Sequence, residues 1–127
     1  MTNKASRVTE RLQHIREAIQ NAKNDLGGLT KDQFLADGKT QRAVIESITV
    51  IGESANSIMH LAPRLEQQSP DLWQHFQDVY DMRIILTHGY FRVDLSVVWD
   101  TIKNDLPKLE ALLGGVDIRN GDDDGGS

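Results

Sequence analysis

The chain has no cysteine, and this absence excludes disulfide bonds and thiolate metal sites. It has only three prolines, and 39% of its 127 residues are hydrophobic, a composition typical of an ordered globular protein. No apolar run approaches the roughly 18 residues that a membrane span needs, and residues 1–11 lack the apolar stretch of a signal peptide. These absences predict one domain that acts in the cytoplasm without a membrane anchor.

Basic residues are outnumbered by acidic ones, which gives a net charge of −5 and a pI near 5.2. This balance argues against a protein that coats nucleic acid through a broad basic surface. Four of the acids, Asp117 and residues 122–124, lie in a glycine-rich stretch at the C-terminus, and without them the chain is close to neutral. We therefore expect a single domain over residues 1–113, an acidic disordered tail over residues 114–127, and room for a local cationic site.

Apolar residues recur at intervals of three and four in several segments, as in amphipathic helices. The expected helices cover residues 8–26, 39–62, 70–87 and 94–113. A short helical turn is expected after Thr30, because Thr30 and Gln33 resemble a capping box. No segment alternates apolar and polar residues as a strand does. The sequence predicts an all-α fold, a compact bundle of four to five helices.

Two residues interrupt the expected helices. Gly52 costs about 1 kcal/mol relative to alanine unless another helix packs closely against it. Pro107 lacks a backbone donor and crowds the carbonyl of Lys103, which predicts a bend in the last helix.

Three chemically useful side chains, Arg83, His88 and Tyr90, lie near the expected end of the third helix. They offer a permanent cation, an imidazole that titrates near neutral pH and a phenol that can donate a proton or be modified. On a straight helix Arg83 and His88 point about 140° apart. They can share a site if the helix unwinds at residues 87–89, or if a second copy of the chain supplies the partner across a two-fold axis. We expect both.

A simpler interpretation exists for the same residues. An arginine near a helix C-terminus interacts favourably with the helix dipole, and a histidine there often caps carbonyls. Tyr90 and Phe91 can be core aromatics, as we expect Trp73, Phe76 and Trp99 to be. The spacing of these side chains alone favours this structural interpretation.

The order of Arg83, four residues, His88, one residue and Tyr90 resembles the signature of the HepT-like toxins of the HEPN superfamily. The resemblance covers roughly residues 6–113 and includes further segments that match the family: Ile51-Gly52-Glu53, Met82, Phe91-Arg92-Val93-Asp94, Val98-Trp99 and Asp105-Leu106-Pro107. It implies a HEPN-like helical bundle that dimerises through the region carrying the motif, as a homodimer or a larger oligomer.

The resemblance also implies a toxin that cleaves RNA, such as a transfer or messenger RNA, without a metal or a cofactor. His88 would act as general base or acid on the 2′-hydroxyl and the leaving oxygen, and Arg83 would stabilise charge on the phosphoryl group. The expected product carries a cyclic phosphate.

A partner is implied as well, because these toxins are encoded beside a minimal nucleotidyltransferase (MNT) antitoxin. Such antitoxins resemble enzymes that adenylylate the tyrosine of the motif, here Tyr90. The added AMP would block the phosphate site beside Arg83 through its bulk and negative charge.

One position departs from the family, since Ile84 stands where many members carry a polar residue, often asparagine. Glu53, Asp81 and Thr87 are candidate auxiliary polar residues, although a glutamate on a solvated face is the simpler interpretation of Glu53. The departure keeps two alternatives open. The chain can be a non-catalytic helical module that binds the nucleotidyltransferase and serves as its substrate, or a bundle that binds a nucleotide near Arg83.

Overall fold

The computed structural model describes residues 3–88 and 93–115, and every regular element in these two ranges is a helix. The elements are α1 (Lys4–Leu26), α2 (Lys31–Leu35), α3 (Gly38–Leu61), α4 (Leu65–Gln68), α5 (Pro70–His88), α6 (Leu95–Asp100), the π-helical turn η2 (Thr101–Asp105) and α7 (Leu106–Gly114). The predicted all-α fold class is therefore confirmed. Among the helices of these ranges, none combines the length and apolarity needed to cross a membrane.

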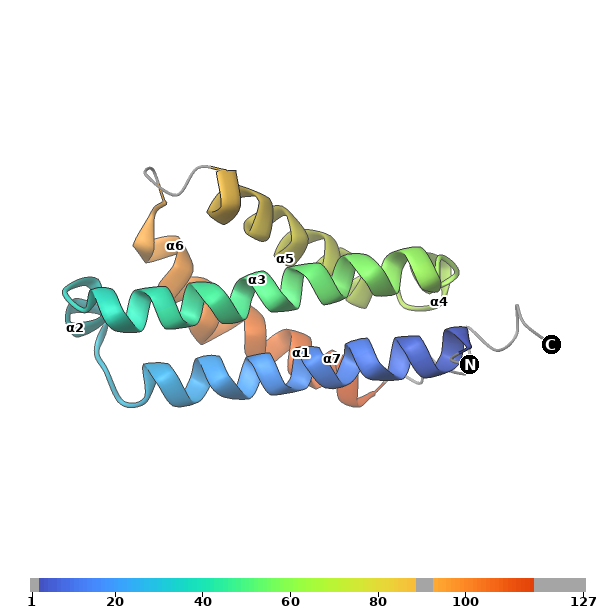
Figure 1. The fold of residues 1–127 in the computed structure, drawn as a ribbon, viewed down its shortest axis with the longest axis horizontal. Helices are drawn as coiled ribbons and strands as arrows, with labels where there is room; N and C mark the ends of the chain where they lie inside the picture. The colour runs from blue at the N-terminus through green and yellow to red at the C-terminus, as the bar shows by residue number, and fades with distance from the viewer. Residues whose placement is uncertain (1–2, 89–92, 116–127) are drawn as a thin grey trace.

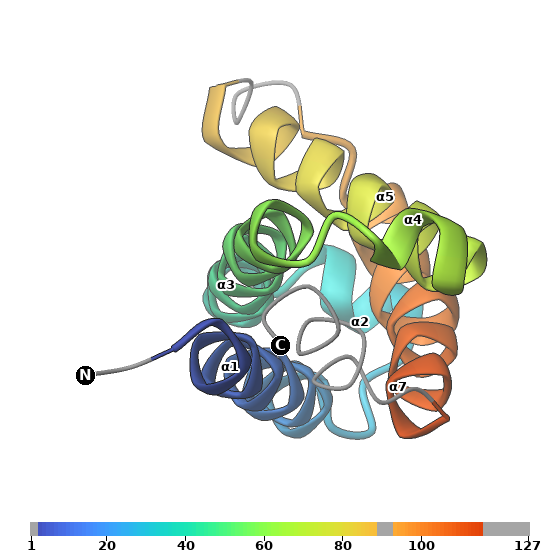
Figure 2. The same ribbon diagram turned by 90° about the vertical axis from the view of Figure 1, so that its right-hand side faces the viewer.

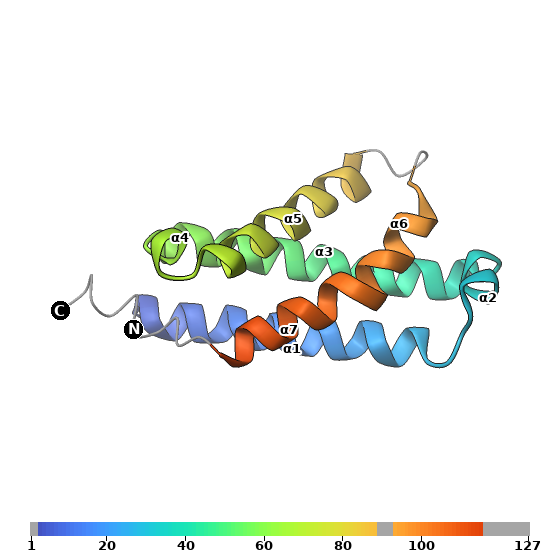
Figure 3. The ribbon, with the colours of Figure 1, turned by 180° about the vertical axis from the view of Figure 1, so that it is seen from behind.

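Four long helical segments build the bundle, and two short helices join them. Helices α1 and α3 lie side by side and run in opposite directions, while α5 crosses α3 obliquely (Figure 1). The segment from α6 to α7 passes behind α1 and α3 in that view and in front of them in the reverse view (Figure 3). The C-terminal end of α5 stands away from the rest of the bundle (Figure 2).

The first helices begin and end at residues whose side chains or backbone satisfy the free helix ends. The capping box predicted for α2 is present, since the Gln33 amide donates to Thr30 Oγ1 at 3.2 Å and the Thr30 amide donates to Gln33 Oε1 at 2.9 Å. Helix α1 ends at Gly27, which adopts a φ of +53° that glycine tolerates best. Helix α3 begins after Asp37, and the backbone amide of Thr40, followed by its hydroxyl, holds the pKa of the Asp37 carboxyl below its ordinary value.

The last helix was expected to bend at Pro107. The structure shows an irregularity there in the form of a π-helical turn that precedes the proline. Asp94 caps the start of α6 by accepting from the Ser96 amide at 2.9 Å. In η2 the Leu106 amide reaches back to the carbonyl of Thr101, one residue further than in an α-helix. This wider turn accommodates Pro107, which has no donor for the carbonyl of Lys103.

The core lies where α1, α3, α5 and α7 meet, and it consists almost entirely of aliphatic side chains. Its largest fully buried members are Val8, Ile15, Ile19, Phe34, Ile48, Ile51, Ile58, Leu65, Leu72, Phe76, Leu106 and Leu109. Of the aromatics expected in the core, Phe76 is fully buried, whereas Trp73 and Trp99 are half-buried. Phe34 of the short helix α2 packs on Trp99 with ring centroids 5.6 Å apart, which closes one end of the core.

Helices α3 and α5 make their closest approach at Gly52. A Cβ atom built on Gly52 would lie 2.6 Å from the Cβ of Arg83 and 2.9 Å from the carbonyl oxygen of Val79. Both distances are shorter than van der Waals contact. The close packing expected at this glycine is thus confirmed. It places the side chain of Arg83 directly against α3.

The change Gly52→Ala should lower the free energy of unfolding by about 1 to 2 kcal/mol, because the cost of overpacking exceeds the gain in helix propensity. Urea denaturation followed by circular dichroism measures the change. Gly114→Ala is the matched control, since nothing lies within 4 Å of a Cβ there, and it should be neutral. Equal stability of the two variants would contradict the close approach.

Candidate active site

Arg83 projects from α5 across the flank of α3. Its Cβ lies against Gly52, and its Nη2 donates to Glu53 Oε1 at 3.2 Å. The guanidinium carbon lies 6.0 Å from the centre of the Tyr80 ring, within reach of a cation–π interaction. Gly52, Glu53 and Tyr80 therefore hold the guanidinium at one place on the surface.

The ion pair between Arg83 and Glu53 leaves the cation available to a ligand. The Glu53 side chain is 58% exposed and that of Arg83 is 25% exposed. Exposed pairs contribute only about 0 to 1 kcal/mol, so a phosphate oxygen can compete with the carboxylate. The Nε of Arg83 is buried and has no acceptor among residues 3–88 and 93–115, so the Nη atoms are the donors that a ligand can reach.

The three candidate auxiliary residues have different surroundings. Glu53 lies on a solvated face, as the simpler interpretation held, and its carboxylate also contacts Arg83. Thr87 Oγ1 donates to the carbonyl of Arg83 at 2.8 Å, so its hydroxyl is bonded within its own helix. Asp81 is exposed and points about 160° away from Arg83 around α5. The described structure thus places only Glu53 at the guanidinium.

His88 is the last residue of α5, and its side chain is exposed. Its Nδ1 lies 3.2 Å from the carbonyl oxygen of Ile84. Because a carbonyl only accepts, we assign the ring proton to Nδ1, which leaves the lone pair of the neutral imidazole on Nε2. His88 therefore caps a carbonyl, as the simpler interpretation held, while Nε2 remains able to transfer a proton.

Arg83 and His88 do not converge within one chain. Helix α5 is continuous through His88, so the expectation that it unwinds at Thr87 and His88 is wrong. The bond from His88 to Ile84 shows the physical reason, since the imidazole stabilises the last helical turn. With the helix intact, the two side chains point about 140° apart. The route through a second copy of the chain stays a prediction, and Tyr90 lies outside the described residues.

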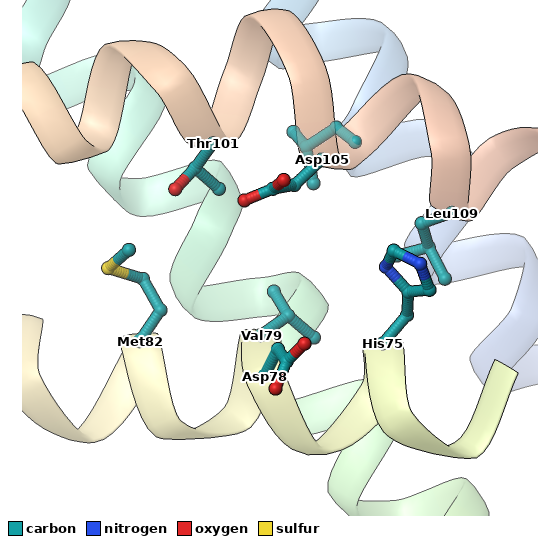
Figure 4. A pocket seen from close by; sticks show the side chains of 8 residues that line it. His75, Asp78, Val79, Met82, Thr101, Asp105 and Leu109 are labelled. Carbon is teal, nitrogen blue, oxygen red and sulfur yellow. The ribbon is translucent and has the colours of Figure 1, made fainter. Parts of the chain in front are cut away.

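Two hollows border α5 that the sequence did not lead us to expect. A cavity of about 80 Å³ lies between α5 and the segment of η2 and α7, where Met82 lies opposite Thr101 and His75 lies beside Leu109 (Figure 4). Its volume suits a few water molecules at most. Within residues 3–88 and 93–115, no group of three or more histidine and acidic side chains is placed to hold a metal ion.

The second hollow, about 490 Å³ in volume, lies between α3 and α5, and we call it the α3–α5 hollow. Trp73, Gln77 and Tyr80 line it from one flank of α5, and Asn56 lines it from α3. The spacing of four and three residues between the α5 members was a helical-face signal in the sequence. Trp73 packs against the core, as expected, and it is also part of the wall of the hollow.

The chain is similar over most of its length to a described family of ribonucleases. The family "Ribonuclease HepT-like" matches residues 15–115. The "Probable ribonuclease HepT" of Thermococcus cleftensis is 36% identical over 99 residues, which cover 78% of this chain and 86% of that protein.

Two further relatives carry similar names. A Methanocaldococcus jannaschii protein, "Gamma-glutamylcyclotransferase and putative RNase", is 34% identical over 99 residues, covering 78% of this chain and 42% of that protein. A "Putative RNase" of Caldanaerobacter subterraneus is 29% identical over 101 residues, covering 78% of this chain and 84% of its own length. No solved structure gives a significant match.

Proposed function

This chain belongs to the HepT-like ribonuclease family, and from that premise we propose that it is a metal-independent endoribonuclease whose active site combines Arg83 of one protomer with His88 of another. One observation carries the proposal. The bond from His88 Nδ1 to Ile84 leaves Nε2 without a partner in that bond, at an exposed helix end, on the same helix as the guanidinium that Glu53 contacts.

The proposed reaction needs only these two side chains and the RNA itself. Nε2 of a neutral His88 takes the proton from a ribose 2′-hydroxyl, and the 2′-oxygen attacks the adjacent phosphorus. The bond from phosphorus to the 5′-oxygen breaks, and the imidazolium returns its proton to that oxygen. The products are a 2′,3′-cyclic phosphate and a 5′-hydroxyl, while Arg83 stabilises the charge on the phosphoryl oxygens.

An exposed apolar patch next to His88 supports pairing of two protomers. Ile84 is 37% exposed and Ile85 is 56% exposed, both on the last turns of α5, which stand away from the bundle (Figure 2). A two-fold interface uses the same patch twice and brings two α5 ends together. Ile84, which departs from the polar residue of many family members, would then contribute to the interface.

Arg83→Met and His88→Ala should each reduce RNA cleavage by about 10²- to 10³-fold, because the first removes the charge and the second removes the proton carrier. Methionine keeps the aliphatic stem that packs on Gly52, so the fold should persist. Cleavage of labelled RNA, with 2′,3′-cyclic ends identified by mass spectrometry and EDTA present, measures the effect.

Arg16→Met and His14→Ala on α1 are matched controls and should retain full activity. Undiminished cleavage by both site variants would remove these residues from the mechanism. Cleavage abolished by EDTA alone would contradict metal independence.

Mixing the Arg83→Met and His88→Ala proteins tests whether the site is shared between protomers. Each mixed dimer would contain one intact pair of Arg83 and His88, so equimolar mixing after subunit exchange should restore about one quarter of wild-type activity. Activity is measured on the same RNA before and after mixing. If each site lies within one chain, no activity returns.

The resemblance further supports a toxin that a nucleotidyltransferase antitoxin neutralises by adenylylating Tyr90. Co-expression with the neighbouring nucleotidyltransferase should add the mass of one or more AMP groups to the intact chain, and peptide mapping should place the first on Tyr90. The Tyr90→Phe protein should stay unmodified at that position. An unchanged mass for the wild-type chain would contradict this form of regulation.

A non-catalytic binding module is the second candidate, and the ion pair of Arg83 with Glu53 favours it, because the carboxylate offsets the cation. In that case the chain would bind the nucleotidyltransferase and serve as its substrate without cutting RNA. RNA that stays intact at high protein concentration, with no cyclic phosphate ends, would support the module and contradict the ribonuclease.

A further inference from the structure

The α3–α5 hollow is connected to the guanidinium of Arg83 through the ring of Tyr80. Tyr80, which lines the hollow, is the aromatic ring beneath that guanidinium, at 6.0 Å. Asn56, on the opposite wall, lies one helical turn beyond Gly52 and Glu53. A ligand whose phosphate reaches Arg83 would therefore have its neighbouring group at the mouth of this hollow.

The side chains of the hollow suit a flat, uncharged ring with hydrogen-bonding edges. Trp73, Tyr80 and Met59 supply apolar and aromatic surface, on which a nucleobase can stack. Asn56 and Gln77 carry side-chain amides that make no hydrogen bond within residues 3–88 and 93–115, so each offers a donor and an acceptor. Such amides read base edges in nucleic-acid complexes.

The charges around the α3–α5 hollow favour entry of the base of a nucleotide over entry of its phosphate. The lining contains no lysine or arginine, Asp81 repels anions, and His60 is the one lining residue that can carry a positive charge. A phosphate is therefore attracted more strongly to the permanent cation of Arg83, next to Tyr80, than to the hollow itself. The volume, about 490 Å³, falls within the usual range of small-molecule sites, about 300–1,000 Å³.

Two other hollows do not offer this combination. The cavity beside Asp78 and Asp105 measures about 80 Å³, which is too small for a base. A hollow of about 420 Å³ along the N-terminal half of α3 is lined by Ile45, Leu86 and other residues, with no aromatic ring among them.

We infer that the α3–α5 hollow is a nucleobase subsite, which binds the base of a nucleotide whose phosphate contacts Arg83. The inference rests on the proposed ribonuclease function for the statement that this nucleotide belongs to RNA next to the cleaved bond. Stacking on Trp73 and Tyr80 supplies binding, and the amides of Asn56 and Gln77 select among bases. Cleavage then depends on the identity of that base.

Fluorescence of Trp73 tests the subsite without cleavage. In a Trp99→Phe protein, Trp73 is the one remaining tryptophan of the chain. Titration with each of the four nucleoside monophosphates should change its emission in a saturable manner, with at least one base preferred. Ribose 5-phosphate, which has no base, should leave the emission unchanged.

Asn56→Ala and Gln77→Ala in the same background should each weaken binding of the preferred nucleotide by about tenfold. Asn24→Ala and Gln20→Ala, whose amides bond to each other on the exposed face of α1, are the matched controls and should bind as the parent protein does. Emission that responds equally to ribose 5-phosphate, or unchanged affinity in both hollow variants, would overturn the subsite.

The two proposals can fail separately. Base-dependent binding by a protein that leaves RNA intact would keep the subsite and remove the ribonuclease. RNA cleavage with the same base preference in wild type, Asn56→Ala and Gln77→Ala would keep the ribonuclease and remove the subsite.

Discussion

The contact of α3 with α5 at Gly52 is the constraint on which the site depends. With no side chain at this position, the backbone of α5 at Val79 and the stem of Arg83 lie directly on α3. The guanidinium is then within reach of Glu53, and the α3–α5 hollow opens beside it. Because the two helices cross obliquely, the end of α5 with His88 leaves the bundle (Figure 1). Gly52 thus fixes Arg83 on the flank of α3, while His88 lies at the exposed end of α5.

Much of the fold could be predicted because its signals are local. Three such signals are the Thr30 capping box, the Asp94 cap and the helix end at Gly27. In each case the interacting residues lie within one helical turn, so a short stretch of sequence includes both partners. Gly52 was informative for a related reason. A glycine inside a strongly periodic apolar helix costs stability, and close helix packing is the usual compensation.

The rest depends on contacts between distant segments. The partner of Arg83 is 30 residues away, and only the crossing at Gly52 selects Glu53 from the acidic residues of the chain. Pro107 indicates that the helix lacks one backbone donor, but a helix can adapt to this in several ways. The sequence does not specify the π-helical turn that the structure shows. The hollow between Trp73 and Asn56 arises from the divergence of two helices, a property that neither helix has alone.

An acidic chain can act on RNA if it binds one phosphate at a fixed place and does not rely on a broad basic surface. A coating protein gains affinity from many exposed cations, which release counterions from the nucleic acid. Here a single guanidinium is held between Gly52, Glu53 and Tyr80, and its carboxylate partner reduces the attraction for any phosphate that reaches it. Charge alone would therefore bind RNA weakly and without preference. Binding energy must come from elsewhere, and stacking and amide contacts beside the phosphate are uncharged sources that depend on the base. Glu53 partly neutralises the guanidinium, so its attraction for phosphate is weak. A neighbouring hollow that binds a base would then supply a larger share of the binding energy, and that share depends on the base.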